Sequence, residues 1–428
     1  MAERTIKVDA LARVEGEGAI KLKIGPSGVE AAEFRIFEPP RFFEALLRGR
    51  DAADAPDITS RICGICPVAY ITSANQAMEA ALGVTVTPEI AALRRLLYCG
   101  EWIQSHVLHA AMLHAPDFLG LEDAFEIARL RPDLVKTALR LKKLGNELME
   151  VIGGRAVHPV NTRIGGFWRA PDPERIAALI PELEWGIGAA RDMTLDFAGF
   201  DFPQDEADYT FVSLVHPETY PIELGRIGSN RGLDIGVEAF AEHFAEEQVA
   251  RSTALHARHG DAPYLVGPLA RYANNFARLS DSCRDTAAAA GLGPVERNPF
   301  RSILVRMVEV QYACEEALRL ARGYVPPDPP AVVAPRRAGT GHGCTEAPRG
   351  ICHHSYTLDD EGRILSAAIV PPTSQNQKQI EDDLARVAGR FLDLDDAALQ
   401  WRCEQAIRNH DPCISCATHA LRPTIERV

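Results

Sequence analysis

Two Cys-x-x-Cys pairs, one near each end of the chain, constrain this sequence more than any other feature. Cys63 and Cys66 form the first pair, and Cys413 and Cys416 form the second. A spacing of two residues lets both thiolates of a pair point to one place from a single turn. If the two pairs act together, the fold must join positions that are roughly 350 residues apart in the sequence.

The spacing alone leaves several kinds of site open. Four cysteines can bind structural zinc, but zinc ribbons usually place their pairs only about 15 to 20 residues apart. A redox-active metal, a separate dithiol switch at each pair, and unrelated surface thiols are the other possibilities. Ten cysteines in 428 residues are too few for a disulfide scaffold. In a reducing compartment, the two pairs therefore favour metal or redox chemistry.

The composition excludes two classes of partner. The chain has 46 Lys and Arg against 59 Asp and Glu, a net charge of −13, and no basic run longer than a pair. It therefore lacks the basic face that a nucleic acid or an anionic membrane requires. No apolar stretch of about 18 residues occurs, and the N-terminus has no apolar signal core. We expect a cytoplasmic protein without a membrane span.

The hydrophobic periodicity predicts a mainly α fold with small β additions (α+β), built on a central bundle of long helices. Long helices are predicted over residues 89–113, 133–152, 173–195, 233–258 and 299–322. Gly153-Gly154 supplies a natural C-cap for one of them. Pro67 suits the first turn of a helix, so residues 63–66 should form a tight turn that leads into a helix.

Two β-hairpins are predicted outside the bundle. The first covers residues 18–37 with its turn at 25–28, because apolar residues alternate with lysines before the GPSG turn. Five prolines within Pro326–Pro335 then predict an extended connector, since proline interrupts helices and central strands. The second hairpin follows this connector.

The second hairpin turns at the sequence DDEG. Pairing Leu358 with Arg363 sets its register. Arg349 then lies opposite Pro372 and next to Thr373, and a slip of two residues would still bring the open ends together. A guanidinium and a hydroxyl are thus expected at one place.

The segments around both cysteine pairs resemble those of the large subunit of nickel-iron hydrogenases. These segments are RICGICPVAY (61–70) and DPCISCATH (411–419). The resemblance extends over essentially the whole chain, through RVEGEG (13–18), PPRFFEALLRGRD (39–51), GGRAVHPVNTRIGG (153–166), YLVGPLARYANN (264–275), EAPRG (346–350) and VPPTSQN (370–376). It implies the hydrogenase large-subunit fold and reversible heterolytic cleavage of dihydrogen.

The resemblance also implies how the cysteines are used. Cys63 and Cys413 are expected as terminal nickel ligands, while Cys66 and Cys416 bridge nickel to an iron that carries carbon monoxide and cyanide. Soft thiolates suit nickel, which changes oxidation state during such a reaction.

Other residues match the family's catalytic and cofactor-binding positions. Arg349 resembles the arginine held over the open metal position, although an isolated arginine after a proline is more often a surface residue. Glu15 matches a proton-relay glutamate next to Cys413, with Glu17 as a nearby competitor and a solvated turn acid as the alternative. The residues Pro348, Thr373 and Asp411 are expected to contact the cofactor or to orient its ligands.

A second metal site and a processed tail are further expectations. Glu44 and His419 resemble ligands of a magnesium ion, although Glu44 is alternatively a helix-start acid favoured by the macrodipole. Residues 420–428 match a C-terminal extension that a maturation protease removes after nickel-insertion factors have acted.

The implied organisation is one large-subunit domain over residues 1–428. Its parts are a β-rich N-terminal region (1–60), a helical core (61–325), a proline-rich connector with a hairpin and a helix (326–410), a metal-ligand segment (411–419) and the cleavable extension (420–428).

Partner subunits must supply the electron carriers. The chain has neither the cysteine spacing of iron-sulfur clusters nor a GxGxxG after a strand. A small subunit with iron-sulfur clusters and diaphorase-type flavin and NAD(P) subunits are therefore expected, with Arg155 and His158 in the contact to the electron-transfer subunit. Tyr70 and Ser105 depart from the commonest family residues and resemble the cytoplasmic bidirectional or sulfhydrogenase group linked to NAD(P). The alternatives are a deazaflavin-reducing hydrogenase and a metal-free coupling subunit related to the quinone-site subunit of respiratory NADH dehydrogenase.

Overall fold

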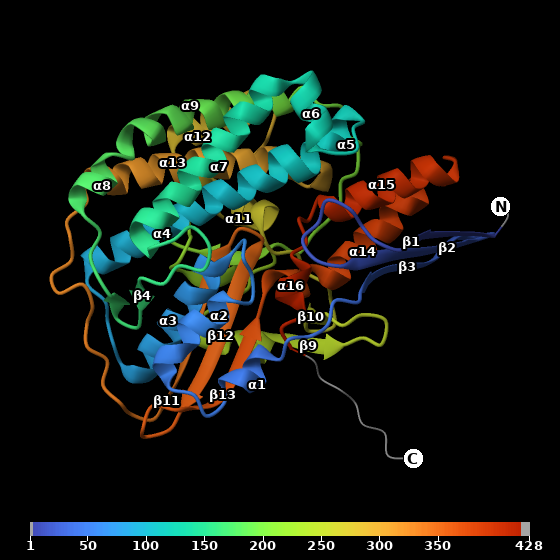
Figure 1. Ribbon diagram of the computed structural model, residues 1–428. Helices are drawn as coiled ribbons and strands as arrows, with labels where there is room; N and C mark the ends of the chain where they lie inside the picture. The colour runs from blue at the N-terminus through green and yellow to red at the C-terminus, as the bar shows by residue number, and fades with distance from the viewer. Residues whose placement is uncertain (1–2, 421–428) are drawn as a thin grey trace, which may run out of the picture.

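Long helices that pack side by side form the centre of the computed structural model, which describes residues 3–420 (Figure 1). These are α4 (Pro88–Val107), α7 (Pro132–Gly153), α9 (Ile180–Phe197) and α13 (Ser302–Arg322). Helix α3 (Pro67–Leu82) lies beside them and packs mainly on strand β11 (Gly339–Ala347). Helix α4 contacts both α7 and α13, and α13 also contacts α9. Their facing sides carry most of the largest hydrophobic core. The predicted mainly α fold is confirmed.

Other helices surround this bundle. They are α1 (Phe43–Leu47), α2 (Ala55–Ser60), α5 (Ala115–Leu119), α6 (Ala124–Leu130), α8 (Pro173–Ala177), α10 (Phe240–His243), α11 (Pro268–Asn275), α12 (Asp281–Ala289), α14 (Pro372–Arg390), α15 (Asp396–Arg408) and α16 (Ile414–Ala417). Among residues 3–420, no helix combines the length and apolar character that a membrane crossing requires.

Five small sheets complete the described fold. Their strands are β1 (Arg4–Val8), β2 (Gly18–Gly25) and β3 (Gly28–Ile36); β4 (Thr162–Arg163) and β5 (Gly166–Phe167); β6 (Val212–Val215), β7 (Arg226–Ser229) and β8 (Asp234–Ile235); β9 (Phe244–Gln248) and β10 (Leu255–His259); and β11 (Gly339–Ala347), β12 (Gly350–Leu358) and β13 (Ile364–Val370). All named strand pairs are antiparallel.

Several helix boundaries agree with the sequence-based predictions. Pro67 is the first residue of α3, and Cys66 is its N-cap. Helix α7 ends at Gly153, and Gly154 follows with φ 86°, the left-handed conformation that glycine adopts without strain. The predicted helix over 173–195 is divided into α8 and α9, because Pro181 lacks the N–H of a helix interior and instead stands at the start of α9.

The predicted helix over 233–258 is wrong. This segment contains the short α10 and the β9–β10 hairpin. Phe240 and Phe244 have helical spacing, but Phe244 opens β9 opposite His259. The turn between the strands is fixed from outside, because the Thr253 N–H donates to the Ile36 carbonyl at 2.8 Å. Pairing across the fold thus overrides the local helical pattern.

The predicted N-terminal hairpin is confirmed as β2 and β3, which turn between Gly25 and Gly28. Strand β1 adds a third strand that the sequence pattern did not predict. The second hairpin is also part of a three-stranded sheet, because β11 pairs with β12.

The predicted register of the second hairpin is corrected. Leu358 pairs with Ile364, and a bulge at this point shifts the pairing to His353 opposite Val370, two residues from the predicted alignment. Arg349 lies in the tight turn between β11 and β12, so it is not a strand residue opposite Pro372. The shift is the slip of two residues that the prediction allowed, and Arg349 and Thr373 both contact the segment 411–413.

The two ends of the chain meet beside α14. Glu15 forms an isolated parallel bridge with Cys413, and the Ile414 N–H donates to the Glu15 carbonyl at 3.0 Å. The Phe43 N–H donates to the His419 carbonyl at 2.9 Å. The segment before β2 and helix α1 therefore hold the segment that carries the last cysteine pair.

Candidate metal centre

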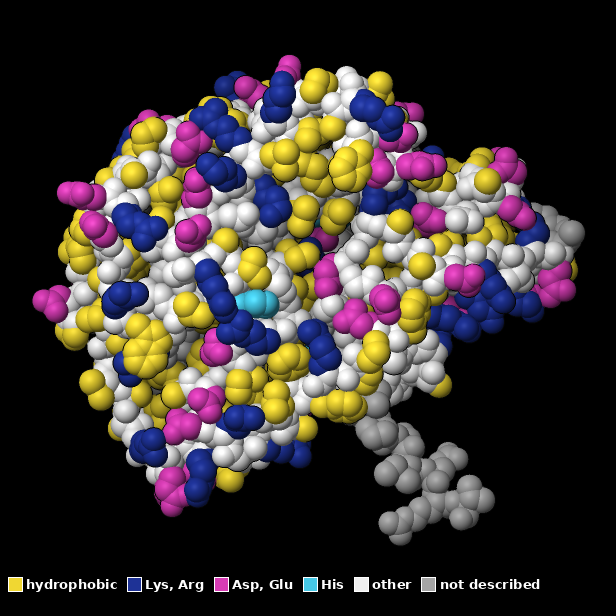
Figure 2. All heavy atoms as spheres, viewed as in Figure 1, with side chains coloured by type: hydrophobic (Ala, Val, Ile, Leu, Met, Phe, Trp, Pro, Cys, Tyr) yellow, Lys and Arg dark blue, Asp and Glu magenta, His cyan; other side chains and the backbone are white. Residues whose placement is uncertain are grey.

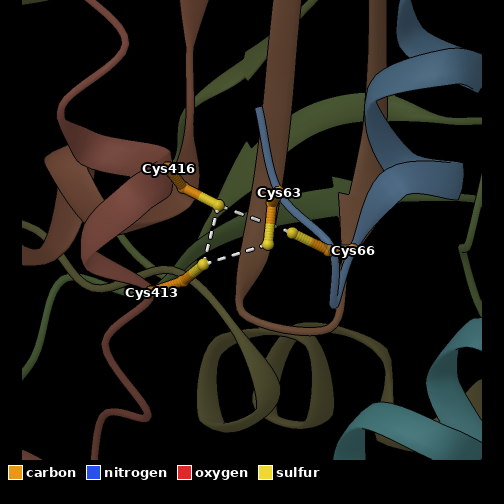
Figure 3. Close-up of side chains that lie close together, drawn as sticks. All are labelled: Cys63, Cys66, Cys413 and Cys416. Atoms are coloured by element: carbon orange, nitrogen blue, oxygen red, sulfur yellow. Dashed lines mark hydrogen bonds between the residues drawn. The ribbon is translucent and has the colours of Figure 1, made fainter. Parts of the chain in front are cut away.

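The four paired cysteines form one buried cluster (Figure 3). Their Sγ atoms all lie within 4.8 Å of one another, and none is in a disulfide. Sγ of Cys63 is 3.3 Å from Sγ of Cys413, and Sγ of Cys66 is 3.5 Å from Sγ of Cys416. The second pair is closer still, at 2.8 Å. Both ends of the chain therefore contribute two soft ligands to one point.

Local structure places each pair. Cys63 and Cys66 stand in the turn between α2 and α3, where the Ile65 N–H donates to Cys63 Sγ at 3.3 Å. Cys413 is the N-cap of α16 and Cys416 lies within that helix. The Cys413 N–H donates to the Thr373 hydroxyl at 3.0 Å, which ties the second pair to the first turn of α14. Thr373 acts here as an acceptor, so its own hydroxyl hydrogen remains available.

The thiol cluster favours one negative charge and opposes more. A hydrogen bond from Cys413 lowers the pKa of Cys63 well below its usual value. Burial raises the pKa of Cys413 well above it. Four buried thiolates would repel one another unless cations lay between them, because burial weakens the screening of their charges. The donor set therefore fits soft metal ions.

Arg349 is buried beside this cluster. Its Nε donates to the Asp411 carbonyl at 2.8 Å, and its Nη2 donates to Asp411 Oδ1 at 3.0 Å. Nη1 is 3.3 Å from the Ser105 hydroxyl. Only 2% of Arg349 is exposed, so the surface alternative does not apply. Burial lowers the pKa of Arg349, but the negative charges of Asp411 and Cys413 raise it by more, so the guanidinium stays charged.

Two further residues fix the turn that carries Arg349. Arg271 on α11 donates to the Ala347 carbonyl at 2.7 Å and to the Pro348 carbonyl at 2.9 Å. The Glu309 carboxylate accepts hydrogen bonds from Nε and Nη2 of Arg271, at 2.9 and 2.8 Å. Sequence reasoning did not single out Arg271 or Glu309. The sequence could have indicated them in one way only: each is a charged residue inside a segment that is expected to be buried or to match the family.

Glu15 contacts the second cysteine pair. Its Oε2 accepts from Cys413 Sγ at 3.1 Å and from the Ser415 N–H at 3.0 Å. Burial raises the pKa of Glu15, and the charge on Cys63 raises it further. Glu17 is exposed, so the structure places Glu15 rather than its competitor against the thiols.

Glu44 and His419 lie on the outer side of the second pair. His419 Nδ1 is 2.8 Å from the Cys416 carbonyl, and His419 Nε2 is 3.8 Å from Glu44 Oε1. Glu44 is in the first turn of α1, as the macrodipole alternative expects, and its Oε1 also accepts from the Ile369 N–H at 2.8 Å. Burial lowers the pKa of His419, but Glu44 and Glu246 raise it by more.

The fold and the site together define a thiolate-rich metalloprotein whose centre joins both ends of a helical chain. A family model described as nickel-dependent hydrogenase matches residues 41–132. The alpha chain of sulfhydrogenase 1 from Pyrococcus furiosus is 32% identical over 424 residues, which cover 97% of this chain and 98% of the relative. The chain belongs to the family of nickel-dependent hydrogenase large subunits.

Two other comparisons agree. The corresponding chain of the F420-non-reducing hydrogenase from Methanothermobacter thermautotrophicus is 30% identical, covering 97% of this chain and 95% of the relative. A crystal structure of an NAD+-reducing [NiFe]-hydrogenase in the H2-reduced state superposes with a TM-score of 0.85 at 25% identity, over 98% of this chain and all of the other. The chain is therefore a nickel-iron hydrogenase catalytic subunit, which confirms the predicted family, fold and enzyme class.

Proposed function

We propose that Cys63 and Cys413 hold nickel as terminal ligands, and that Cys66 and Cys416 bridge it to an iron carrying carbon monoxide and cyanide. The observation that carries this proposal is the convergence of four buried Sγ atoms from both chain ends within 4.8 Å. Such a centre supplies the polarising and electron-accepting chemistry of reversible heterolytic dihydrogen cleavage. The protein residues supply the surroundings and the proton route.

Arg349 fixes a positive charge over the sulfur cluster. Asp411 holds the guanidinium by two contacts, and Ser105 holds its remaining end. A charge that is already oriented in a buried site stabilises charge separation without further reorganisation. Asp411 and Thr373 thus orient the second cysteine pair, while Pro348 shapes the turn. We assign Arg349 to polarisation of the bound dihydrogen.

Glu15 carries protons away from the Cys413 sulfur. Its Oε2 is within hydrogen-bond distance of that sulfur, and the pKa that burial raises makes its carboxylate a better proton acceptor. Glu15 is partly exposed, so the carboxyl group links the buried thiol to the surface.

Glu15→Gln is expected to leave nickel content near the wild-type level and to lower hydrogen oxidation by about a hundredfold, because an amide cannot relay a proton. Nickel analysis and dye reduction under hydrogen measure the two effects. Glu17→Gln is the matched control and should retain full activity. Equal activity of the Glu15 variant and the control would remove Glu15 from the proton route.

Glu44 and His419 hold a magnesium ion behind the second pair. A carboxylate and an imidazole that face each other beside the Cys416 carbonyl offer hard ligands to such an ion. Glu44→Gln is expected to remove magnesium from the purified protein and to lower its midpoint of thermal unfolding. Elemental analysis measures the ion, and unchanged magnesium content would contradict the site.

The first cysteine pair reaches the surface at an apolar face. Gly64, inside the turn of this pair, is exposed, and a Cβ there would lie 3.8 Å from Val157 Cγ1. Val157, Val160 and Trp168 are about half exposed, with exposed fractions of 50%, 47% and 58%. In Figure 2, apolar and basic side chains cover the surface around β4. Exposed apolar patches of this kind mark protein interfaces.

This apolar face binds the iron-sulfur partner subunit, because it adjoins the exposed turn that carries the first cysteine pair. His158 lies in the same contact, with Nδ1 2.8 Å from the Ser60 carbonyl. Val160→Asp is expected to weaken the affinity for the small subunit by about tenfold. Phe125→Asp, on exposed α6, is the control. Size-exclusion chromatography with nickel analysis compares them, and an intact complex with Val160→Asp would contradict this placement.

Flavin and NAD(P) subunits of the diaphorase type complete the complex, which works in the cytoplasm. The similarity to an NAD+-reducing hydrogenase and to the alpha chain of a sulfhydrogenase supports this acceptor over deazaflavin. The four thiols oppose the metal-free coupling subunit. Assays of hydrogen-driven reduction of NADP, NAD and deazaflavin by the purified complex decide among them, and reduction of deazaflavin alone would overturn the nicotinamide assignment.

The position of the last cysteine pair supports an order of maturation in which nickel insertion precedes cleavage. Cys416 and His419 are buried, and the His419 carbonyl accepts from the first residue of α1, so nickel-insertion factors must act before this segment closes. The proposed protease would then remove the extension that begins at residue 420, of which 421–428 lie outside the described residues. Mass spectrometry of the nickel-loaded protein checks this, and an intact tail would contradict the cleavage.

A further inference from the structure

One face of helix α4 binds the turn of the first cysteine pair. Glu101, Gln104 and Ser105 follow one another at helical spacing on this face, and all three are buried. Gln104 Nε2 donates to the Ile65 carbonyl at 2.6 Å, inside the Cys-x-x-Cys turn. Ser105 meets Arg349. Glu101, on the same face, contacts the start of α3.

Glu101 completes the first turn of α3. Its Oε2 accepts from the Val68 N–H at 2.6 Å, and its Oε1 accepts from the Ala69 N–H at 3.1 Å. The first N–H groups of a helix lack partners within that helix, and Pro67 has none to offer. Cys66, the N-cap, supplies no side-chain hydrogen bond to this turn. A carboxyl group from another helix therefore does what a capping side chain usually does.

The ionic surroundings point to the same role. Within residues 3–420, Glu101 takes part in no ion pair. A fully buried carboxyl group without a direct ion-pair partner is costly to keep, and its two N–H contacts offset part of that cost. Both contacts fall within three residues of Cys66.

We propose that Glu101 is a positioning residue of the metal centre: its carboxyl group anchors the start of α3 and thereby sets where Cys66 presents its sulfur. The inference rests on the proposed metal centre. Gln104 fixes the carbonyl side of the same turn, so the turn is held from both sides by one helix face.

Hydrogen exchange of the metal-free chain tests the contact. Glu101→Gln keeps the size of the side chain but turns an NH2 group toward one of the two N–H donors. Exchange in a peptide covering residues 67–70 is expected to be faster by about tenfold. Unchanged exchange would overturn the anchoring role, whether or not the wild-type chain binds nickel.

Nickel binding tests whether Glu101 positions the metal ligand Cys66. Glu101→Gln should lose nickel to a chelator about tenfold faster than wild type and show an altered nickel paramagnetic resonance signal, because ligand orientation governs the affinity of the site. Glu101→Asp keeps the carboxyl group and should restore part of the nickel retention and part of the wild-type resonance signal. If the Gln variant does not fold, the Asp variant carries the test, with a smaller shift in the same direction.

Glu79→Gln, on the helix that Glu101 anchors (α3), is the matched control. Glu79 is a buried carboxylate that binds Arg94 and the Gly165 N–H, far along α3 from Cys66. Its loss should destabilise the chain while leaving exchange at 67–70 and the nickel signal as in wild type. Faster exchange in Glu101→Gln with wild-type nickel retention and signal would show a structural cap only and overturn the proposal. A wild-type chain without nickel would instead refute the proposed centre itself.

Discussion

Replacing Cys63 or Cys413 by serine is expected to abolish both nickel retention and hydrogen oxidation. Serine keeps the size of the side chain, but its hydroxyl is a hard, neutral donor at neutral pH and a poor nickel ligand. The two sulfurs are 3.3 Å apart, so either substitution opens the same side of the site. We expect nickel below about a tenth of the wild-type content.

Cys314→Ser is the matched control for this prediction. Cys314 is equally buried but lies in α13, outside the cluster of four thiols. It should lower the free energy of unfolding slightly and leave nickel content unchanged. Near-normal hydrogen uptake by Cys63→Ser or Cys413→Ser would refute the proposed ligand set.

Arg349→Lys has the second largest expected effect. Lysine keeps the positive charge, but its ammonium cannot reproduce the contacts of the guanidinium with Asp411 and Ser105 at once. Because preorganised charges commonly contribute about a hundredfold to a rate, we expect a loss of about that size in hydrogen turnover. Nickel content should stay at the wild-type level.

Arg94→Lys separates this effect from a loss of folding. Arg94 is also buried in α4, where it pairs with Glu79 at the far end of α3. This control should shift thermal unfolding while keeping the turnover of each nickel-loaded molecule. If Arg349→Lys turned over as fast as wild type, Arg349 would have no part in the reaction.

Those residues of the site that lie in short motifs can be predicted from the sequence. The Cys-x-x-Cys pairs, the proline that starts α3 and the arginine after a proline are all visible in the sequence. Their convergence is a long-range property, because contacts such as the bridge between Glu15 and Cys413 join segments that are far apart in the sequence. Local periodicity does not report such a pairing.

The elements that sequence patterns miss have physical reasons. Strand β11 contains Gly339, Gly341 and Gly343, which do not favour strands, but α3 packs directly on their backbone. A Cβ at Gly341 would lie 2.0 Å from the Ala77 carbonyl oxygen, so glycine is required there. The role of Glu101 is hidden because its partners are backbone N–H groups of another helix. Such partners leave no trace in a sequence.

Elemental analysis of the purified complex tests the central claim most directly. About one nickel per chain is predicted, since all four thiolates converge on a single site. Iron should exceed the amount that the partner's clusters contain. A fully folded complex with zinc or no metal in place of nickel would contradict the account.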